Sequence, residues 1–205
     1  MEFDPRNLTE RDNYKLLSGS IVPRPIAWVS TRNGAGLPNL APFSFFNMIS
    51  SRSTTPPLLI LSIGRRPDGR KDTARNILET GEFVVNIVSE ELAEAMYVTS
   101  LEYGPEENEF EIAGLTALPG VRVRAPRVKE SPIQLECTLN AVQEIGQRPN
   151  TLVIGEVVYI HIRDDLVHEG RIDFAKLRPL GRLAGDLYCK MGEVVRVGKD
   201  SLGRT

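Results

Sequence analysis

The chain has 205 residues, with 25 Lys and Arg against 27 Asp and Glu, and a formal net charge of −2. This length suits one domain, and the even charge balance argues against a broad nucleic-acid-binding surface. No apolar run reaches the roughly 20 residues that a membrane-spanning helix needs, and the polar, acidic N-terminus does not resemble a signal peptide. We therefore expect a cytoplasmic globular protein with neither nucleic acid nor membrane as a partner.

The first element that the sequence indicates is a helix around 9–17. Runs rich in β-branched and aromatic residues then predict six strands, because such side chains suit a pleated, half-buried surface. Asn and Gly in the loop at 32–36 favour a hairpin between the first two strands. The six predicted strands are Ile26–Thr31, Leu40–Ile49, Leu58–Ile63, Glu82–Val88, Ile133–Val142 and Thr151–Ile162.

Two further helices are expected in the first half of the chain. Asp72–Thr80 has Asp72 as a candidate N-cap and Gly81 as a C-terminal stop, and Ser89–Thr99 has Ser89 as its candidate cap. The charged, Gly- and Pro-rich segment 102–132 is interpreted as an excursion or a lid. Many short strands and few helices predict a mainly β fold, an antiparallel barrel that is closed or partly closed, with a few peripheral helices.

A basic loop at 64–73 precedes the helix that starts near residue 72. Arg65, Arg66, Arg70 and Lys71 crowd into it, and Thr73 adds a hydroxyl group. A helix start offers unpaired N–H groups and partial positive charge, and Arg and Lys form charge-assisted hydrogen bonds to phosphate oxygens. Two interpretations remain open on spacing alone: a phosphate-binding loop, or a solvated basic loop ahead of a helix.

The segment 39–47 is apolar on both faces but is interrupted by Ser44 and Asn47. Small residues would let a flat ring approach the backbone, and the two polar side chains could bond its polar edge. The alternative is a central barrel strand whose aromatic residues fill the core. Together with the basic loop, the stretch 23–86 suggests a flavin nucleotide, ring at one end and phosphate at the other.

Other motifs are excluded or carry little information. Gly34–Asn39 is a near-miss to the dinucleotide fingerprint, since it lacks the third glycine and no helix follows. His161 and His168 form no recognisable metal set with the two cysteines, and His161 is expected as a hydrogen-bonded barrel residue. Cys137 lies on the apolar face of a strand and is expected to be inert.

Seven segments, taken together, carry a family resemblance. They are GSIVPRPIAWVST, PNLAPFSFFN, GRRPDGRKDTARNI, EFVVNIVSEELAEAM, PIQLECTL, VIGEVVYIHI and RPLGRLAGDLY. In order and spacing they resemble the flavin reductase-like family, which has the FMN-binding split-barrel fold. The similar subgroup includes flavoredoxin-like proteins and the reductase components of two-component monooxygenases. The resemblance implies a single domain over 1–205, with its core at about 14–195 and a flexible tail at 196–205.

The resemblance also implies a homodimer that binds FMN, rather than FAD, near its interface. Asp72 would cap the helix or orient Lys71, and Asn86 would be a polar contact or a brace. Arg182 and Tyr188, late in the chain, would approach the site from the same subunit or from the other one. No catalytic residue can be assigned, since the cofactors carry the chemistry. The residues expected to bind the cofactor are Asn39, Ala41, Pro42, Phe43, Ser44, Arg65, Lys71, Asp72, Thr73, Asn86, Arg182 and Tyr188.

Two departures from relatives flank this expected site: a longer connection at 51–55, and Ala184-Gly185 where many relatives carry two glycines. They bear on the orientation of the ring and on substrate access.

The leading functional hypothesis is an NAD(P)H-dependent flavin reductase with small-molecule substrates and, as a candidate partner, a monooxygenase or other redox protein. One alternative is an FMN-binding electron carrier without NAD(P)H activity of its own. The other is a split barrel whose site has been adapted to haem or another phosphate ligand.

Overall fold

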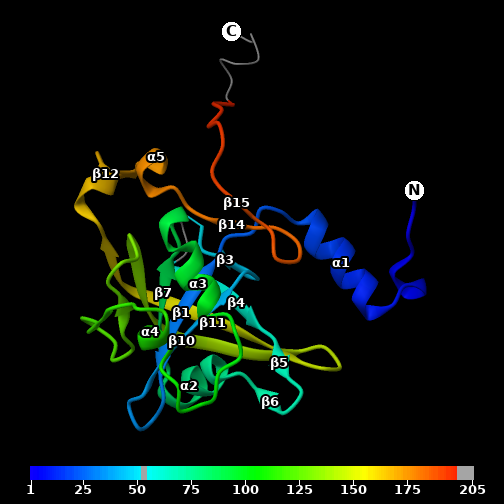
Figure 1. Ribbon diagram of the computed structural model, residues 1–205, viewed down its shortest axis with the longest axis horizontal. Coiled ribbons are helices and arrows are strands. Elements are labelled where there is room, and N and C mark those ends of the chain that lie inside the picture. Colours follow the sequence, from blue (N-terminus) through cyan, green and yellow to red (C-terminus); the bar gives the residue numbers. More distant parts are fainter. Residues whose placement is uncertain (52–54, 198–205) are drawn as a thin grey trace.

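A curled sheet of seven strands forms the body of the molecule (Figure 1). The computed structural model describes residues 1–51 and 55–197. The strands lie in the order β2-β1-β7-β10-β11-β4-β3, and every neighbouring pair is antiparallel. Their bounds are β1 Ala27–Arg32, β2 Pro38–Phe43, β3 Phe46–Met48, β4 Leu58–Ile63, β7 Glu82–Ile87, β10 Ile133–Ile145 and β11 Asn150–Ile162.

A short connection between the two edge strands requires this sheet to curl into a barrel. Strands β2 and β3 lie at opposite edges of the sheet, yet only Ser44 and Phe45 separate them in sequence. Two residues cannot span a flat sheet of seven strands, so the edges must approach each other. The expected antiparallel split barrel is confirmed, but the single strand predicted over Leu40–Ile49 is wrong. It breaks at Ser44 because the chain leaves one edge there and joins the other.

Helices pack against the barrel, although the first of them projects away from its body (Figure 1). In the described residues, none has the length and apolar character that crossing a bilayer requires. The helices are α1 Glu10–Ser20, α2 Asp72–Thr80, α3 Ala93–Val98, α4 Glu109–Ile112 and α5 Phe174–Leu177, with 3-10 turns at Pro5–Asn7, Glu90–Leu92 and Asp164–Leu166. Four small hairpins complete the fold: β5 Arg65–Arg66 with β6 Gly69–Arg70, β8 Ala117–Leu118 with β9 Arg127–Val128, β12 Val167–His168 with β13 Arg171–Ile172, and β14 Gly181–Arg182 with β15 Tyr188–Cys189.

The ends of the predicted helices agree in part with the structure. Gly81 ends α2 in a left-handed conformation, as expected. The N-cap position, however, belongs to Lys71, whose ammonium group cannot accept a hydrogen bond from the helix. The carboxylate of Asp72, the expected cap, binds two arginines instead. The helix predicted over Ser89–Thr99 is shorter, since a 3-10 turn at Glu90–Leu92 precedes α3.

The two faces of β1 pack against different cores. Ala27 and Val29 face the barrel interior, whereas Trp28 faces outward beneath α3 and α4 and donates a 2.9 Å hydrogen bond to Thr99 Oγ1. The alternation follows from the two-residue period of a strand. The interior cluster consists of Ala27, Val29, Phe43, Leu59, Leu61, Ile63, Ala74, Ile77, Phe83, Val85, Cys137 and Val153.

Gly155 in β11 leaves room for the ring of Phe83. A Cβ at this position would collide with Cζ of that ring, and the neighbouring Leu59 leaves little space for it to shift. We expect Gly155→Ala to destabilise the fold by about 1–3 kcal/mol, the usual cost of overpacking a core. Urea denaturation measures this change, and a stability equal to that of the wild type would contradict the packing described.

The segment 102–132 is an excursion that is firmly attached to the barrel. The buried carboxylate of Glu136 accepts hydrogen bonds from the backbone N–H groups of Val121, Arg122 and Val123, at 2.8, 2.6 and 3.0 Å. It also bonds His161 Nε2 at 2.6 Å, which confirms the expected hydrogen-bonded role of this histidine. Burial acts to raise the pKa of Glu136, but these hydrogen bonds together lower it.

Candidate functional site

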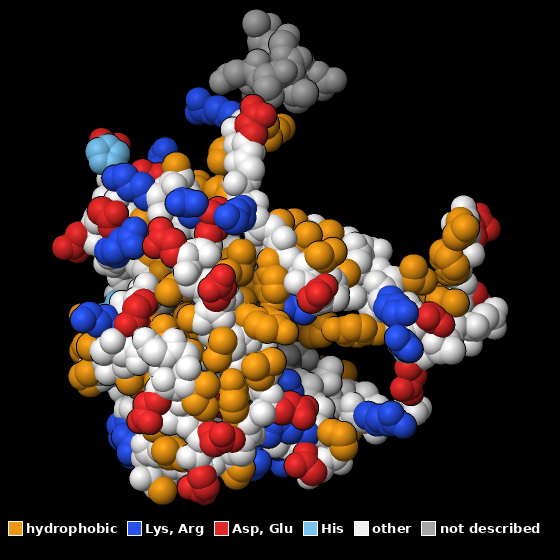
Figure 2. Space-filling view, viewed as in Figure 1, with side chains coloured by type: hydrophobic (Ala, Val, Ile, Leu, Met, Phe, Trp, Pro, Cys, Tyr) orange, Lys and Arg blue, Asp and Glu red, His pale blue; other side chains and the backbone are white. Residues whose placement is uncertain are grey.

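A cleft opens where the barrel is split. On the face seen in Figure 2, the molecule is hollowed between α1 and the body that carries the β5–β6 hairpin. The cavity there has a volume of about 670 Å³, within the usual range for a small-molecule site. It is lined by Tyr14, Ser18, Arg24, Ile26, Pro42, Phe43, Ser44, Phe45, Ser62, Gly64, Lys71, Met96, Tyr97, Ser100, Asn150, Arg182, Leu183, Gly185, Asp186 and Tyr188.

A second, narrower cavity of about 100 Å³ continues from this cleft. The two share Pro42, Lys71 and Ser100 in their walls, so they meet at the start of α2. A wide chamber joined to a small polar one matches a flat ring system with a phosphate-bearing chain. The smaller cavity is lined by Asn39, Ala41, Pro42, Arg66, Lys71, Asp72, Thr73, Thr99, Ser100, Leu101, Glu102 and Glu109.

Lys71 is the cation at the junction of the two cavities. Its Nζ lies 5.7 Å from the centre of the Phe43 ring and forms no ion pair within the described part of the chain. Burial, and then the charge of Arg66, lower the pKa of Lys71, while Glu102 acts in the opposite direction. A bound anion would supply the missing counter-charge. Beside it, Thr73 is buried and accepts a 3.0 Å hydrogen bond from Asn39 Nδ2.

The structure does not bring Arg65 to either cavity. Its guanidinium bonds Glu144 at 2.9 Å, and Arg70 bonds the same carboxylate at 3.0 Å, so both arginines tie the β5–β6 hairpin to β10. Arg66 lies in the wall of the smaller cavity instead. Arg66 lines the cavity and Arg65 does not, because neighbouring side chains on a strand of the hairpin point to opposite faces.

Asp72 pairs with arginines and not with Lys71. Its carboxylate bonds Arg66 at 3.1 Å and also contacts Arg75 one helical turn along α2. The expected role of orienting Lys71 is therefore wrong. By binding both arginines, Asp72 holds Arg66 against the wall of the smaller cavity.

The β14–β15 hairpin brings Arg182 and Tyr188 to the large cleft within the same chain. Arg182 pairs through its backbone with Arg24, in two hydrogen bonds of 2.9 Å. Its guanidinium contacts the Tyr188 hydroxyl and the Gly185 carbonyl, and lies 4.5 Å from the centre of the Tyr188 ring. These two residues thus form one wall of the cleft.

Asn86 lines neither cavity. Its side chain is fully buried, donates to Trp28 O at 2.9 Å and Ser30 Oγ at 3.0 Å, and accepts from Val128 N at 2.9 Å. Of the two expected roles, this geometry supports the brace. Asn47, a candidate for the ring edge, is exposed and also lies outside both cavities.

Sequence reasoning missed Arg24, the most enclosed cation of the cleft. It is 7% exposed and donates to the carbonyls of Ser18, Ile21 and Leu183, at 2.5, 2.8 and 2.7 Å. One partner is 159 residues away, so no local pattern could reveal this role. The segment PRP marks the position in sequence but does not indicate which groups the guanidinium meets.

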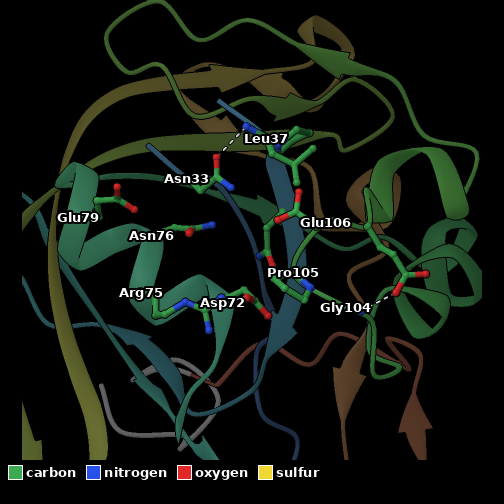
Figure 3. Close-up of a pocket in the computed structure, with 12 residues that line it drawn as sticks. Asn33, Leu37, Asp72, Arg75, Asn76, Glu79, Gly104, Pro105 and Glu106 are labelled. Carbon is green, nitrogen blue, oxygen red and sulfur yellow. Dashed lines mark hydrogen bonds and ion pairs between the residues drawn. The ribbon is translucent and has the colours of Figure 1, made fainter. Parts of the chain in front are cut away.

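A third cavity, of about 250 Å³, lies between α2 and the loop Gly104–Glu107 (Figure 3). It adjoins the small cavity, since Asn39 and Asp72 line both. Its wall is mainly acidic, with Glu79, Glu106 and Glu107 against Arg75. No group of three or more His, Cys, Asp or Glu side chains in the described residues is arranged to hold a metal ion.

The two departures noted in the sequence have different outcomes. Within the connection 51–55, residues 52–54 lie outside the described residues, as does most of the predicted tail at 196–205. Gly185 adopts a left-handed conformation, with φ of 61°, and its carbonyl accepts from Arg182. Ala184-Gly185 therefore forms the turn that places the hairpin wall.

The two thiols have opposite environments. Cys137 is fully buried in the barrel interior, as predicted, and burial followed by the charge of Glu136 raises the pKa of its thiol well above the usual value. Cys189 is only partly buried. We expect Ellman's reagent to modify Cys189 alone in the native protein and both thiols after denaturation. Native labelling of a Cys189→Ser variant would contradict this assignment.

The chain belongs to the family described as flavin reductase like domain, whose model matches residues 18–180. Its fold is that of a split-barrel protein of this family. Protein BH2278 of Halalkalibacterium halodurans is 44% identical, with 100% of this chain and 99% of that protein covered.

Two solved structures are similar over nearly the whole chain. Nitrilotriacetate monooxygenase component B from Bacillus cereus is 41% identical, with a TM-score of 0.92, and 96% of this chain and 98% of that one are covered. The 2-nitrobenzoate 2-nitroreductase NbaA from Pseudomonas fluorescens is 34% identical, with a TM-score of 0.87 and coverage of 97% and 95%. The chain therefore has the fold of the flavin reductase-like oxidoreductases.

Proposed function

We propose that this protein is a cytoplasmic NAD(P)H-dependent flavin reductase that binds FMN. The observation that carries the proposal is the pair of joined cavities at the split of a flavin reductase-like barrel, one sized for a ring and one for a phosphate. The similarity to a monooxygenase component supports a role in supplying reduced flavin to a monooxygenase or other redox partner.

The residues present fit a flavin nucleotide. Lys71 and Thr73, with Arg66, offer one unpaired cation, a hydroxyl group and a guanidinium at the phosphate end. Ser44, in the connection between β2 and β3, and Ser62, in β4, both line the large cleft and offer hydroxyl groups to the ring. When bound, the flavin supplies a ring that accepts a hydride from the nicotinamide.

The protein's own contribution is position and electrostatics. Arg24 is held by backbone carbonyls and forms no ion pair in the described residues, so it adds a fixed positive charge to the wall of the cleft. Tyr14 and Phe45 meet edge to face at the mouth, with ring centres 6.4 Å apart. These aromatic side chains limit water access and leave an apolar surface against which a nicotinamide can stack.

We also propose that the protein is a homodimer. Large apolar side chains are exposed in the three segments that contribute lining residues to the cleft near α1, β3 and the β14–β15 hairpin, namely Leu17, Ile21, Phe45, Met48, Ile49 and Leu187. Their exposure on a single chain favours cover by a second copy, since contiguous apolar patches mark interaction sites. Analytical ultracentrifugation tests this: a mass of twice 22.8 kDa is expected, and a monomer at micromolar concentration would contradict it.

The reductase proposal is tested by mixing the protein anaerobically with FMN and NADH or NADPH. We expect the flavin absorbance to bleach faster than in a protein-free control, and an equal rate would overturn the proposal. If FMN binds but bleaches only when a partner protein supplies electrons, the electron carrier is the correct function. Absorbance of the purified protein typical of haem would instead favour the adapted split barrel.

A further inference from the structure

The small cavity contains a buried carboxyl group that the proposed function does not use. Glu109, on α4, is 8% exposed and lines this cavity together with Lys71 and Thr73. Its Oε2 accepts a 3.1 Å hydrogen bond from the backbone N–H of Leu40 in β2. A carboxylate and a bound phosphate would therefore share one small chamber.

The charged groups around Glu109 do not neutralise it. Arg66 and Lys71 face it from the basic hairpin and the start of α2, and Asp72 and Glu102 add negative charge. Arg66 is already paired with Asp72, and Glu109 forms no ion pair in the described part of the chain. Burial raises the pKa of Glu109, with hydrogen bonds to backbone N–H groups, among them that of Leu40, acting against this effect.

We propose that Glu109 makes the affinity for phosphorylated flavin depend on pH, with its ionised carboxylate opposing the phosphate. The inference rests on the proposed function. Two negative groups in a partly desolvated chamber repel each other, whereas a protonated carboxyl group can donate a hydrogen bond to a phosphate oxygen. FMN binding should therefore weaken as pH rises and Glu109 ionises. Riboflavin, which lacks the phosphate, should be insensitive to this change.

The experiment compares FMN and riboflavin binding by fluorescence quenching between pH 5 and pH 8. The variants are Glu109→Gln and, as a matched control, Glu111→Gln on the exposed side of the same helix. At pH 8 we expect Glu109→Gln to bind FMN about tenfold more tightly than the wild type, and Glu111→Gln to match the wild type. Riboflavin affinity should be equal in all three proteins.

The pH profile separates a charge effect from a packing effect. The second ionisation of a phosphate monoester, at about pH 6, affects every variant alike, so only the difference between the variants reports on Glu109. This difference should shrink as pH falls. A second variant, Glu109→Ala, should show the same sign even though it loses the bond to Leu40.

Weaker or unchanged FMN binding in both Glu109 variants at pH 8 would overturn the inference. So would a difference between wild type and Glu109→Gln that is independent of pH. If the wild type binds neither FMN nor riboflavin at any pH, the proposed flavin site fails instead, so the two failures are distinguishable.

Discussion

Replacing Lys71 with methionine is expected to weaken FMN binding about 100-fold and to leave riboflavin binding within about twofold, because the lost contact is a charge-assisted bond to phosphate. Lys71 is the unpaired cation at the junction of the two cavities. Methionine retains most of the apolar stem that lies near Phe43, so the ring chamber should keep its shape. Equilibrium dialysis against each flavin measures both affinities.

The matched control is Arg65→Met. Arg65 belongs to the same basic loop, but its guanidinium bonds Glu144 and lines neither cavity. Its loss should not change FMN affinity. If both variants weaken FMN binding equally, the basic loop acts only through its overall charge. If Lys71→Met weakens riboflavin binding as much as FMN binding, the cleft as a whole has collapsed.

Replacing Glu136 with alanine is expected to lower the free energy of unfolding by about 3–5 kcal/mol, the usual cost of breaking a buried charged network. The variant would leave three buried or half-buried N–H groups of the excursion and His161 without their acceptor. Urea denaturation measures the change. Glu91→Ala, on an exposed position, should stay within about 0.5 kcal/mol of the wild type.

The same carboxylate predicts a stability that depends on pH. The pKa of Glu136 is lower in the folded protein than its usual value, so the folded state binds fewer protons at this group than the unfolded state. Its contribution is complete above the unfolded pKa and is lost as pH falls through the folded pKa. In Glu136→Gln we expect a smaller loss of stability between pH 6 and pH 3. An identical acid profile in both proteins would contradict this role.

Those parts of the fold that depend on neighbouring residues could be predicted from the sequence. The alternation in β1 and the Gly81 helix stop both lie within a few residues of the features they determine. The break at Ser44 could not be predicted, because it arises from closing the sheet, with β3 pairing to β4 and Ser62 N donating to Phe45 O. Composition and periodicity carry no information about which edges meet.

The site was predicted less completely than the fold for a similar reason. Lys71 and Thr73 were found because a basic loop before a helix is a local signal. Arg65 is drawn away from the cavity by Glu144, which is 79 residues from it in sequence. The enclosure of Arg24 likewise depends on the distant Leu183. Glu109 comes from the excursion, whose charged and irregular sequence gave no indication that one carboxyl group would be buried beside the phosphate end.

The central claim, that the joined cavities form a flavin site, is tested most directly by titrating the purified protein with FMN at pH 6 and following flavin fluorescence. We expect saturable quenching at one flavin per chain. Fluorescence that remains that of free FMN at all protein concentrations would contradict it.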